Sequence, residues 1–297
     1  MKAAVVFNNF AANGKSKKYK QSLIKEFESA GIEYEFLITE NKEQATTAVR
    51  QLNFNNYNVL IAVGGDGTLF NVVNGYMMNN GESSIPLAVI PIGTGNAFAR
   101  DLNLESNDIT SAVNCIKNGK TKPVDIGKFT TNGDVFYFVN IIGLGFVTDV
   151  ARSAHSLKAL GSLSYTLGVL YHTINLKPFN SLILYDGEEQ EQEVIFIEIS
   201  NTKYTGKDFL MAPEAKIDDG LFDITIMKRS SRMKLLSGLP KIFKGKHIHM
   251  KEVETIKASK ITIKTDSSKI LTPDGEILGS TPLQVECLPG KLEFFSN

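Results

Sequence analysis

The chain has 297 residues, of which 42% are hydrophobic and 22% are charged. Lys and Arg together number 32, as do Asp and Glu, so the formal net charge is zero. This is the composition of an ordinary globular protein, and because it lacks an excess of basic residues it argues against a nucleic-acid partner. The length favours two domains.

The two cysteines, Cys115 and Cys287, are far apart and show neither a disulfide framework nor a zinc-ligand spacing, which favours a reducing compartment. The apolar run 3–7 that follows Met1-Lys2 is too short for a signal-peptide core. No apolar run reaches the roughly 18 residues that a membrane span needs. We therefore expect a cytoplasmic protein, peripherally associated with the inner face of the membrane if its substrate is a lipid.

The N-terminal part alternates short apolar runs with helical patterns, as a doubly wound parallel sheet requires. The expected strands are 3–7, 34–38, 59–63 and 86–90, and the expected helices are 17–30, 43–52, 69–78 and 108–117. Glycine-rich turns follow the third and fourth of these strands, and the loop 8–15 follows the first. Open α/β sheets bind ligands at the carboxyl ends of their strands, so these loops predict one binding edge.

The pattern changes after residue 122 to short β-like runs separated by turn signals. The expected strands are 124–129, 135–142, 181–185, 193–200, 222–227, 260–265 and 284–288, and two helical stretches are expected at 153–176 and 233–243. We predict a doubly wound three-layer α/β nucleotide-binding domain over residues 1–122 and an antiparallel β-sandwich domain over residues 123–297. The last residues are able to pack back on the first domain.

The turn Gly64-Gly65-Asp66-Gly67-Thr68 is the strongest local signal for phosphate binding. Glycines let backbone N–H groups approach a phosphate, and the helix that follows adds positive potential. Asp66 would repel a phosphate unless it binds magnesium or orients a hydroxyl. A plain strand-to-helix connection is the alternative interpretation, and the two accompanying loops favour a nucleotide site instead. Neither the Walker A pattern nor the Rossmann fingerprint is present.

Seven motifs in order give the chain a family resemblance. They are NNFAANGK at 8–15, GGDGTLFNVVNG at 64–75, PIGTGNAFAR at 91–100, VDIGK at 124–128, NIIGLGFVTDV at 140–150, APEAKIDDGLFD at 212–223 and PDGE at 273–276. With these motifs the sequence resembles the diacylglycerol kinase catalytic family, which includes bacterial soluble lipid kinases, sphingosine kinases and ceramide kinases. The resemblance implies an ATP-dependent kinase that phosphorylates a lipid hydroxyl.

The resemblance also implies particular binding residues. It assigns ATP binding to Asn8, Asn9, Phe10, Ala11, Ala12, Thr39, Gly64, Gly65, Asp66, Gly67, Thr68, Leu69, Phe70, Asn71 and Thr94. It implies a structural Mg²⁺ held by the carbonyls of Lys216 and Leu221 and by the Asp219 carboxylate, and oxygen ligands of this kind suit a hard cation.

For catalysis the resemblance implies Glu276 as the base, with Asp274 sharing that role or contacting magnesium. Asp66 is a further candidate catalytic carboxylate because of its position between the glycines of the first turn. From the residues alone, Pro273-Asp274-Gly275 is typical of a simple β-turn. Only the resemblance gives this turn a catalytic role.

Two positions depart from the family pattern. Asn9 replaces the usual proline of the first loop, which removes a preset φ. Ala97 stands where bacterial diacylglycerol kinases usually carry Asp, so the second turn is closer to the sphingosine-kinase form. The expected acceptor is accordingly either diacylglycerol-like or sphingoid, and homodimerisation is left open.

Three further features have competing interpretations. The apolar stripe within 158–179 fits either an acyl channel or an ordinary core helix, and the core helix is the commoner cause. Basic residues at 15–20 and 228–251 fit either anionic headgroups, as in a transient contact with a membrane surface, or a solvated charged face. His247 and His249 lack a third metal ligand at a suitable spacing, which favours a structural role.

Two other functions remain as alternatives. A soluble-substrate kinase such as an NAD kinase shares the GGDGT loop, but no Asn-Glu pair follows that loop here. A non-catalytic nucleotide- or lipid-binding relative is the second alternative, and the retention of Asp66, Asp219 and Glu276 argues against it.

Overall fold

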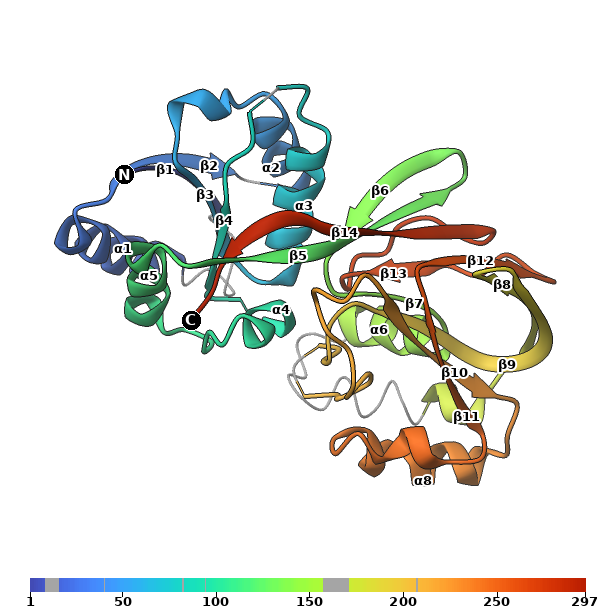
Figure 1. Cartoon of the computed structure of the whole chain (residues 1–297). Helices are drawn as coiled ribbons and strands as arrows, with labels where there is room; N and C mark the ends of the chain where they lie inside the picture. The colour runs from blue at the N-terminus through green and yellow to red at the C-terminus, as the bar shows by residue number, and fades with distance from the viewer. Residues whose placement is uncertain (9–15, 40, 82, 94, 157–170, 207) are drawn as a thin grey trace. The chain divides into compact units, whose positions relative to one another are not determined.

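The computed structural model describes residues 1–8, 16–39, 41–81, 83–93, 95–156, 171–206 and 208–297. The chain forms two compact units (Figure 1). Unit 1 comprises Met1–Ile126 and Pro289–Asn297, and unit 2 comprises Gly127–Leu288. The boundary expected at residue 122 falls within strand β5 (Thr121–Thr131), which runs from unit 1 into unit 2.

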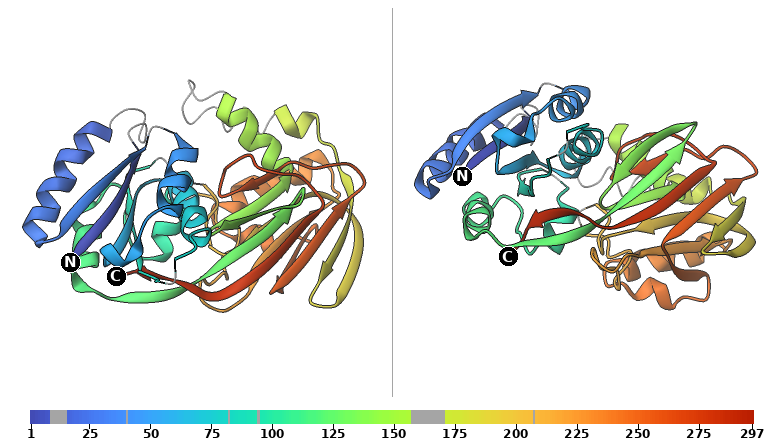
Figure 2. Two further views of the ribbon diagram at one scale, coloured as in Figure 1. Left: turned by 90° about the horizontal axis from the view of Figure 1, so that it is seen from above. Right: turned by 45° about the horizontal axis from the view of Figure 1, so that its top comes forward.

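Unit 1 is built on a parallel sheet in the order β2-β1-β3-β4, and the end of β14 pairs with β4. Helices α1 and α5 lie on one face of this sheet, and α2 and α3 lie on the other (Figure 2). The elements are β1 (Lys2–Asn8), α1 (Ser16–Ala30), β2 (Glu33–Thr39), α2 (Lys42–Arg50), η2 (Phe54–Asn56), β3 (Val59–Gly64), α3 (Asp66–Met77), β4 (Leu87–Pro91), α4 (Ala97–Asp101), α5 (Ile109–Asn118) and β14 (Leu283–Phe295). Every strand and helix expected in this unit is present.

Local signals account for these elements. Every residue of β3 and β4 is buried, as expected for strands covered on both faces. Helix α5 begins where the Asp108 side chain accepts a hydrogen bond from Ser111 N, and it ends at Gly119, which has a φ of 74°. Helix α3 begins three residues earlier than expected, because Gly65 serves as its N-cap.

Unit 2 is an antiparallel β structure with helices on one side. Its elements are the second part of β5, β6 (Asp134–Phe138), β7 (Ile141–Gly145), α6 (Phe146–Ser156), β8 (Phe179–Tyr185), β9 (Glu188–Ser200), β10 (Phe222–Lys228), α8 (Arg232–Ile242), η4 (Lys246–His249), β11 (Val253–Ala258), β12 (Lys260–Thr265), β13 (Leu271–Pro273) and the first part of β14. The strands β11 and β13 were not expected from the sequence.

The strand expected at 135–142 is wrong as a single element, because it is divided into β6 and β7. The division has a physical cause. The backbone amides of Val139, Asn140 and Ile141 donate to the Asp274 carboxylate, so Val139 and Asn140 leave the strand. Likewise β14 extends to Phe295, well beyond the expected 284–288, because its end pairs with β4.

Strand β9 makes the corner of the sandwich. Its first half pairs with β8 through Glu188–Val194, and its second half pairs with β7 and β10. A strand that changes partners in this way connects two layers of a sandwich. Phe146 and Val150 of α6 and Leu235 of α8 pack on Phe196 of β9 and Met227 of β10, which forms an apolar core.

In the part of the chain that the structure describes, no helix is long and apolar enough to cross a membrane.

Candidate active site

The GGDGT turn lies at the junction of β3 and α3. Gly65 caps the helix in an extended conformation, and its carbonyl accepts hydrogen bonds from Thr68 N at 2.9 Å and Leu69 N at 3.1 Å. The backbone N–H of Gly67, in the first turn of α3, donates no hydrogen bond to any of the described residues. A helix N-terminus with an available N–H is a site where a phosphate is stabilised.

The second glycine-rich turn packs directly against the first. A Cβ on Gly93 would lie 2.3 Å from Gly65 Cα, and a Cβ on Gly65 would lie 2.7 Å from the Gly95 carbonyl oxygen. Both contacts are closer than real Cβ atoms allow. The sequence-based reason for these glycines, room for a phosphate, was therefore incomplete. They also let two backbone turns touch.

Asn96 locks the second turn from within, a role that the sequence reasoning missed. Its side-chain Oδ1 accepts from Gly93 N at 3.2 Å, and its Nδ2 donates to Gly93 O at 2.9 Å and to Ser106 Oγ at 3.0 Å. The residue is buried. Asn96 thus fixes both backbone groups of the glycine that contacts the first turn.

Asp66 joins the two turns through its carboxylate. Oδ2 accepts from Ala97 N at 3.1 Å and Oδ1 accepts from Phe98 N at 3.4 Å, while Asp66 N donates to Gly95 O at 3.1 Å. Asp66 therefore acts at the N-terminus of α4, where an acidic group is favourable. Its expected role toward magnesium or a hydroxyl stays a prediction. The Ala97 side chain is buried.

A further predicted nucleotide residue, Thr39, lies at the same carboxyl edge of the unit 1 sheet as the first turn. Thr39 ends β2 opposite Asn8 of β1 and is only 2% exposed. Its Oγ1 atom has no hydrogen-bond partner among the described residues. Since a buried hydroxyl without a partner is costly, this atom is a good candidate for a ligand contact.

The other predicted residues differ in what they can offer. Leu69 and Phe70 are buried in α3, so their side chains serve the core. Asn71 donates from Nδ2 to Gly67 O at 2.6 Å and its carbonyl accepts from Thr46 Oγ1 at 3.2 Å, which ties the first turn to α2. Four predicted positions of the first loop, Asn9, Phe10, Ala11 and Ala12, and also Thr94, lie outside the described residues.

The predicted base lies in unit 2, on the turn that follows β13. Asp274 and Gly275 both have positive φ, 47° and 82°, and Glu276 N donates to Pro273 O at 2.8 Å. Two successive residues with positive φ are typical of a type I′ turn. The turn is thus more sharply defined than the simple β-turn that the sequence indicates.

Asp274 anchors this turn. Its Oδ1 accepts from Asn140 N at 2.9 Å and Ile141 N at 3.0 Å, and its Oδ2 accepts from Val139 N at 3.0 Å. The side chain is only 6% exposed. Both carboxylate oxygens are thus engaged by charge-assisted hydrogen bonds from the backbone, which favours a positioning role. Glu276, two residues on, is half-buried.

The predicted magnesium residues lie in the loop before β10. Asp219 Oδ1 accepts from Leu221 N at 3.2 Å, and Oδ2 lies 3.7 Å from Lys257 Nζ. Burial raises the pKa of neighbouring Asp223, against the opposing effect of Lys257. A carboxylate and two loop carbonyls, those of Lys216 and Leu221, are a donor set that suits a hard cation, so these residues fit Mg²⁺.

Unit 2 also buries a carboxyl group that the sequence gave no reason to single out. Glu198 of β9 is fully buried, and its Oε1 accepts a hydrogen bond from Thr205 Oγ1. Oε2 has no partner among the described residues. Burial raises the pKa of Glu198 from 4.5 to about 7, although the hydrogen bond from Thr205 acts in the opposite direction.

His247 is one of the two histidines whose structural role the sequence favours, and its surroundings agree with that role. His247 is buried, with Nε2 3.0 Å from Met211 O, and burial lowers its pKa. This supports the structural role.

Most of the apolar stripe within 158–179 falls in residues 157–170, which lie outside the described residues. At its end, Tyr171 and Ile174 are 61% and 66% exposed, so the core-helix interpretation is wrong for these two residues.

Two family models match the two halves of the chain. Residues 2–129 match the diacylglycerol kinase catalytic domain, and residues 140–296 match the YegS C-terminal NAD kinase beta sandwich-like domain. Together with the glycine-rich turns at the sheet edge, these matches define the class of protein. It is a kinase with an α/β domain and a β-sandwich-like domain.

Curated relatives and solved structures agree with this class. The chain is 31% identical to a diacylglycerol kinase of Bacillus subtilis over 95% of this chain and 91% of the relative. It is 31% identical to a diacylglycerol kinase of Staphylococcus saprophyticus over 99% and 95%. The crystal structure of a proposed diacylglycerol kinase from Bacillus anthracis superposes with a TM-score of 0.83 at 29% identity, covering 100% of this chain and 95% of that one. The chain belongs to the diacylglycerol kinase family.

Proposed function

We propose that this protein is an ATP-dependent lipid kinase that transfers the γ-phosphate of ATP to a lipid hydroxyl. The observation that carries the proposal is the N-terminus of α3, where Gly65 caps the helix and Gly67 N–H has no acceptor among the described residues. The relatives named diacylglycerol kinase support a lipid as the acceptor of the phosphoryl group. The phosphates of ATP lie against this turn, and Thr39 Oγ1 makes a further contact to the nucleotide.

Glu276 is the general base in this proposal. Removing the hydroxyl proton requires a carboxylate whose lone pairs can reach the acceptor. Asp274 gives its oxygens to three backbone amides, so it holds the turn and leaves proton transfer to Glu276. The rigid turn thereby fixes the backbone from which Glu276 projects.

Mg²⁺ has two roles in the proposal. Bound with ATP, it neutralises charge that develops on the transferred phosphoryl group. Bound by Lys216, Asp219 and Leu221, it stabilises the loop before β10. Mg²⁺ should raise the melting temperature of the free protein, and Asp219→Asn should abolish this increase. An increase that persists in the variant would rule out this loop as the Mg²⁺ site.

The acceptor is diacylglycerol-like or sphingoid. The sandwich half matches a domain described as NAD kinase-like, which keeps NAD as the alternative acceptor. Labelled ATP should be offered with diacylglycerol, monoacylglycerol, sphingosine, ceramide, phosphatidylglycerol and NAD in separate reactions. We expect transfer to a lipid. Transfer to NAD alone, or to none of these, would overturn the proposal.

A further inference from the structure

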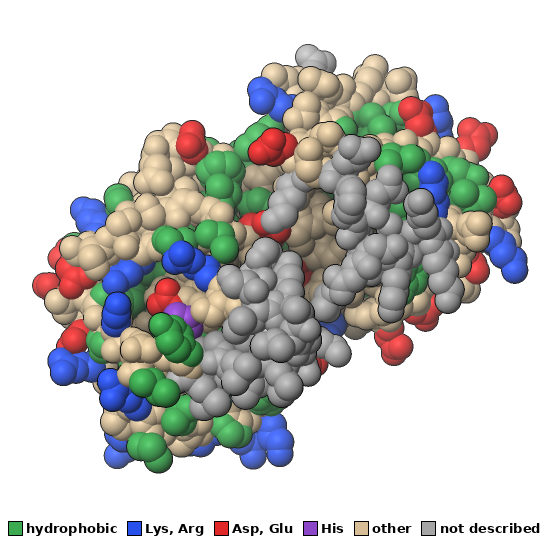
Figure 3. Space-filling model, turned by 180° about the vertical axis from the view of Figure 1, so that it is seen from behind, with side chains coloured by type: hydrophobic (Ala, Val, Ile, Leu, Met, Phe, Trp, Pro, Cys, Tyr) green, Lys and Arg blue, Asp and Glu red, His purple; other side chains and the backbone are tan. Residues whose placement is uncertain are grey.

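Glu198 is a buried carboxyl group that the proposed phosphotransfer does not use. Asp and Glu side chains normally lie at the surface, as Figure 3 shows for one face of the molecule. Glu198 is 0% exposed instead, and its Oε2 atom has no hydrogen-bond partner among the described residues. A buried charge without a partner is costly, so ionisation of Glu198 destabilises whatever keeps water away from it.

The strand register shows which face of the sheet carries Glu198. It lies opposite Thr225 of β10, and two residues away Phe196 lies opposite Met227. Residues opposite each other, and residues two apart on one strand, point to the same face of a sheet. Phe196 and Met227 pack against α6 and α8 in the apolar core. Glu198 therefore points to the face that these two helices partly cover.

The chain that follows β9 returns across this face. We call residues 201–206 and 208–212 the strap. Two backbone hydrogen bonds join its two arms, from Thr205 N to Phe209 O at 2.8 Å and from Ala212 N to Lys203 O at 3.2 Å. The strap is thus a short hairpin that begins directly after β9.

Three polar contacts hold the strap to the face of the sheet. Thr205 Oγ1 donates to Glu198 Oε1. At the other end, Met211 O accepts from Thr225 Oγ1 at 3.4 Å and lies 3.0 Å from His247 Nε2. The contact at Thr205 therefore ties the strap to a carboxyl group whose second oxygen has no partner.

No cation compensates this carboxyl group. Glu198 forms no ion pair within the described part of the chain. On β10, Asp223 faces the same way but pairs with Lys257 at 3.1 Å. The other charged or titratable groups of the strap, α6 and η4, apart from His247, are exposed or half-exposed where the structure describes them, namely Lys203, Tyr204, Asp208, Asp149, Arg152, Lys246 and His249. Burial therefore dominates, and it places the pKa of Glu198 at about 7.

We propose that the strap is a pH-sensitive lid over Glu198, closed while the carboxyl group is protonated and opened when that group ionises. The neutral carboxyl group accepts from Thr205 and carries no charge that needs water. The ionised group is stabilised by water, which reaches it once the strap lifts. The strap leads into the loop 213–221, so its opening also loosens the start of that loop. This lid goes beyond the proposed phosphotransfer and does not depend on it.

The test is hydrogen–deuterium exchange of the full-length protein at pH 5 and pH 8, with rates corrected for the intrinsic effect of pH. Peptides that cover residues 201–212 report on the strap. Their protection should fall about 70-fold from pH 5 to pH 8, the factor given by a pKa of about 7 in the closed state and 4.5 in the open state. Peptides of unit 1 should keep their protection.

Opening of a lid and unfolding of the whole unit give different results. A lid exposes little surface, so exchange of the strap should respond weakly to low concentrations of urea, whereas unfolding of the unit responds strongly. Glu198→Gln keeps the shape of the side chain without the charge, so its strap should be as protected at pH 8 as at pH 5. Thr205→Val should lower protection of the strap at pH 5 about fivefold, because the hydrogen bond to Glu198 is lost.

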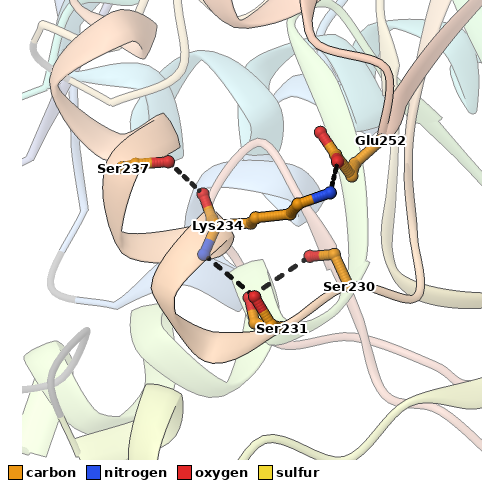
Figure 4. Close-up of polar contacts among 5 residues, drawn as sticks. All are labelled: Ser230, Ser231, Lys234, Ser237 and Glu252. Atoms are coloured by element: carbon orange, nitrogen blue, oxygen red, sulfur yellow. Dashed lines mark hydrogen bonds and ion pairs between the residues drawn. The ribbon is translucent and has the colours of Figure 1, made fainter.

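The matched control is Glu252→Gln, which alters a paired carboxylate of the same unit. Glu252 accepts from the Lys234 ammonium near the start of α8, where Ser231 caps the helix by accepting from Lys234 N at 3.4 Å (Figure 4). The hydrogen bond from Lys234 lowers the pKa of Glu252, so this group is already ionised at pH 5 and at pH 8. The strap of this variant should respond to pH as in wild type.

Several results would overturn the proposal. One is protection of the wild-type strap that does not change with pH, and another is an equal fall in Glu198→Gln. A fall at pH 8 that depends strongly on urea would show unfolding of the whole unit instead of a lid. Unchanged protection in Thr205→Val would contradict the anchoring role of Thr205.

Discussion

Replacing Glu198 by Gln tests the most unusual electrostatic feature of unit 2. Glu198 is fully buried, and its Oε2 atom has no partner among the described residues. Burial disfavours the ionised form, which is why the pKa rises from 4.5 to about 7. Gln has nearly the same shape and carries no charge at any pH.

The sign of the effect follows from proton linkage. Below pH 4.5 the Glu198 carboxyl group is protonated in both the folded and the unfolded chain, so its ionisation does not change the free energy of unfolding. As the pH rises towards 7, the unfolded chain loses its proton and the folded chain keeps it, so the free energy of unfolding falls. With about 1.4 kcal/mol for each pKa unit, the loss amounts to about 3 kcal/mol.

The assay is a series of melting curves between pH 4.5 and pH 8 for wild type and Glu198→Gln. The variant should melt close to wild type at the acidic end. At pH 8 it should be the more stable protein by up to about 3 kcal/mol, which is several degrees in melting temperature. The matched control is Glu191→Gln, which alters an exposed residue of the same strand.

Two results would refute this reasoning. One is a variant whose melting temperature falls with pH as steeply as that of wild type. The other is a variant that is less stable than wild type at pH 8. The control should follow the wild-type curve throughout, because its carboxyl group is exposed in both states.

Three further substitutions probe the turns and the nucleotide edge. Gly93→Ala should lower the free energy of unfolding by about 1 to 3 kcal/mol, because its Cβ would lie 2.3 Å from Gly65 Cα. Gly238→Ala in α8 should leave the melting temperature unchanged or raise it. Equal melting temperatures of the two variants would contradict the packing argument. Thr39→Val should raise the melting temperature of the free protein and weaken ATP binding measured by calorimetry, since the hydroxyl is buried without a partner; unchanged ATP affinity would remove Thr39 from the site. Asp274→Asn should lower the free energy of unfolding by about 2 to 4 kcal/mol in denaturant titrations, because an amide nitrogen cannot accept from the backbone; an unchanged midpoint would show that the anchor is dispensable.

The regular elements of unit 1 could be predicted because their signals are local. The run 59–63 is apolar and ends at a glycine, and Gly31 and Gly119 end helices with positive φ. Periodicity and capping residues depend on neighbours in the sequence, so each element can be recognised alone.

What could not be predicted depends on residues distant in the sequence. The division of 135–142 requires Asp274, more than a hundred residues later. Glu198 lies between Ile197 and Ile199 in a pattern that also suits an exposed face, and only the partner strands β7 and β10 show that it is buried.

For the candidate site, the features that depend on neighbouring residues could be predicted, and the contacts between separate loops could not. The phosphate turn and its position at a strand end follow from sequence, and β3 and α3 place it where expected. The link between Asp66 and Ala97 N could not be predicted, because it requires two loops to meet. Asn96 had a signal in the GTGN turn, since Asn often hydrogen-bonds to nearby backbone groups.

The most direct test of the account is the rate of lipid phosphorylation by Glu276→Gln, measured with labelled ATP and a detergent-dispersed acceptor that wild type uses. The account predicts that kcat falls by about 10² to 10⁴, the usual contribution of a general base, while ATP affinity and melting temperature stay at wild-type values. A variant that phosphorylates the lipid at the wild-type rate would contradict the assignment of Glu276 as the base.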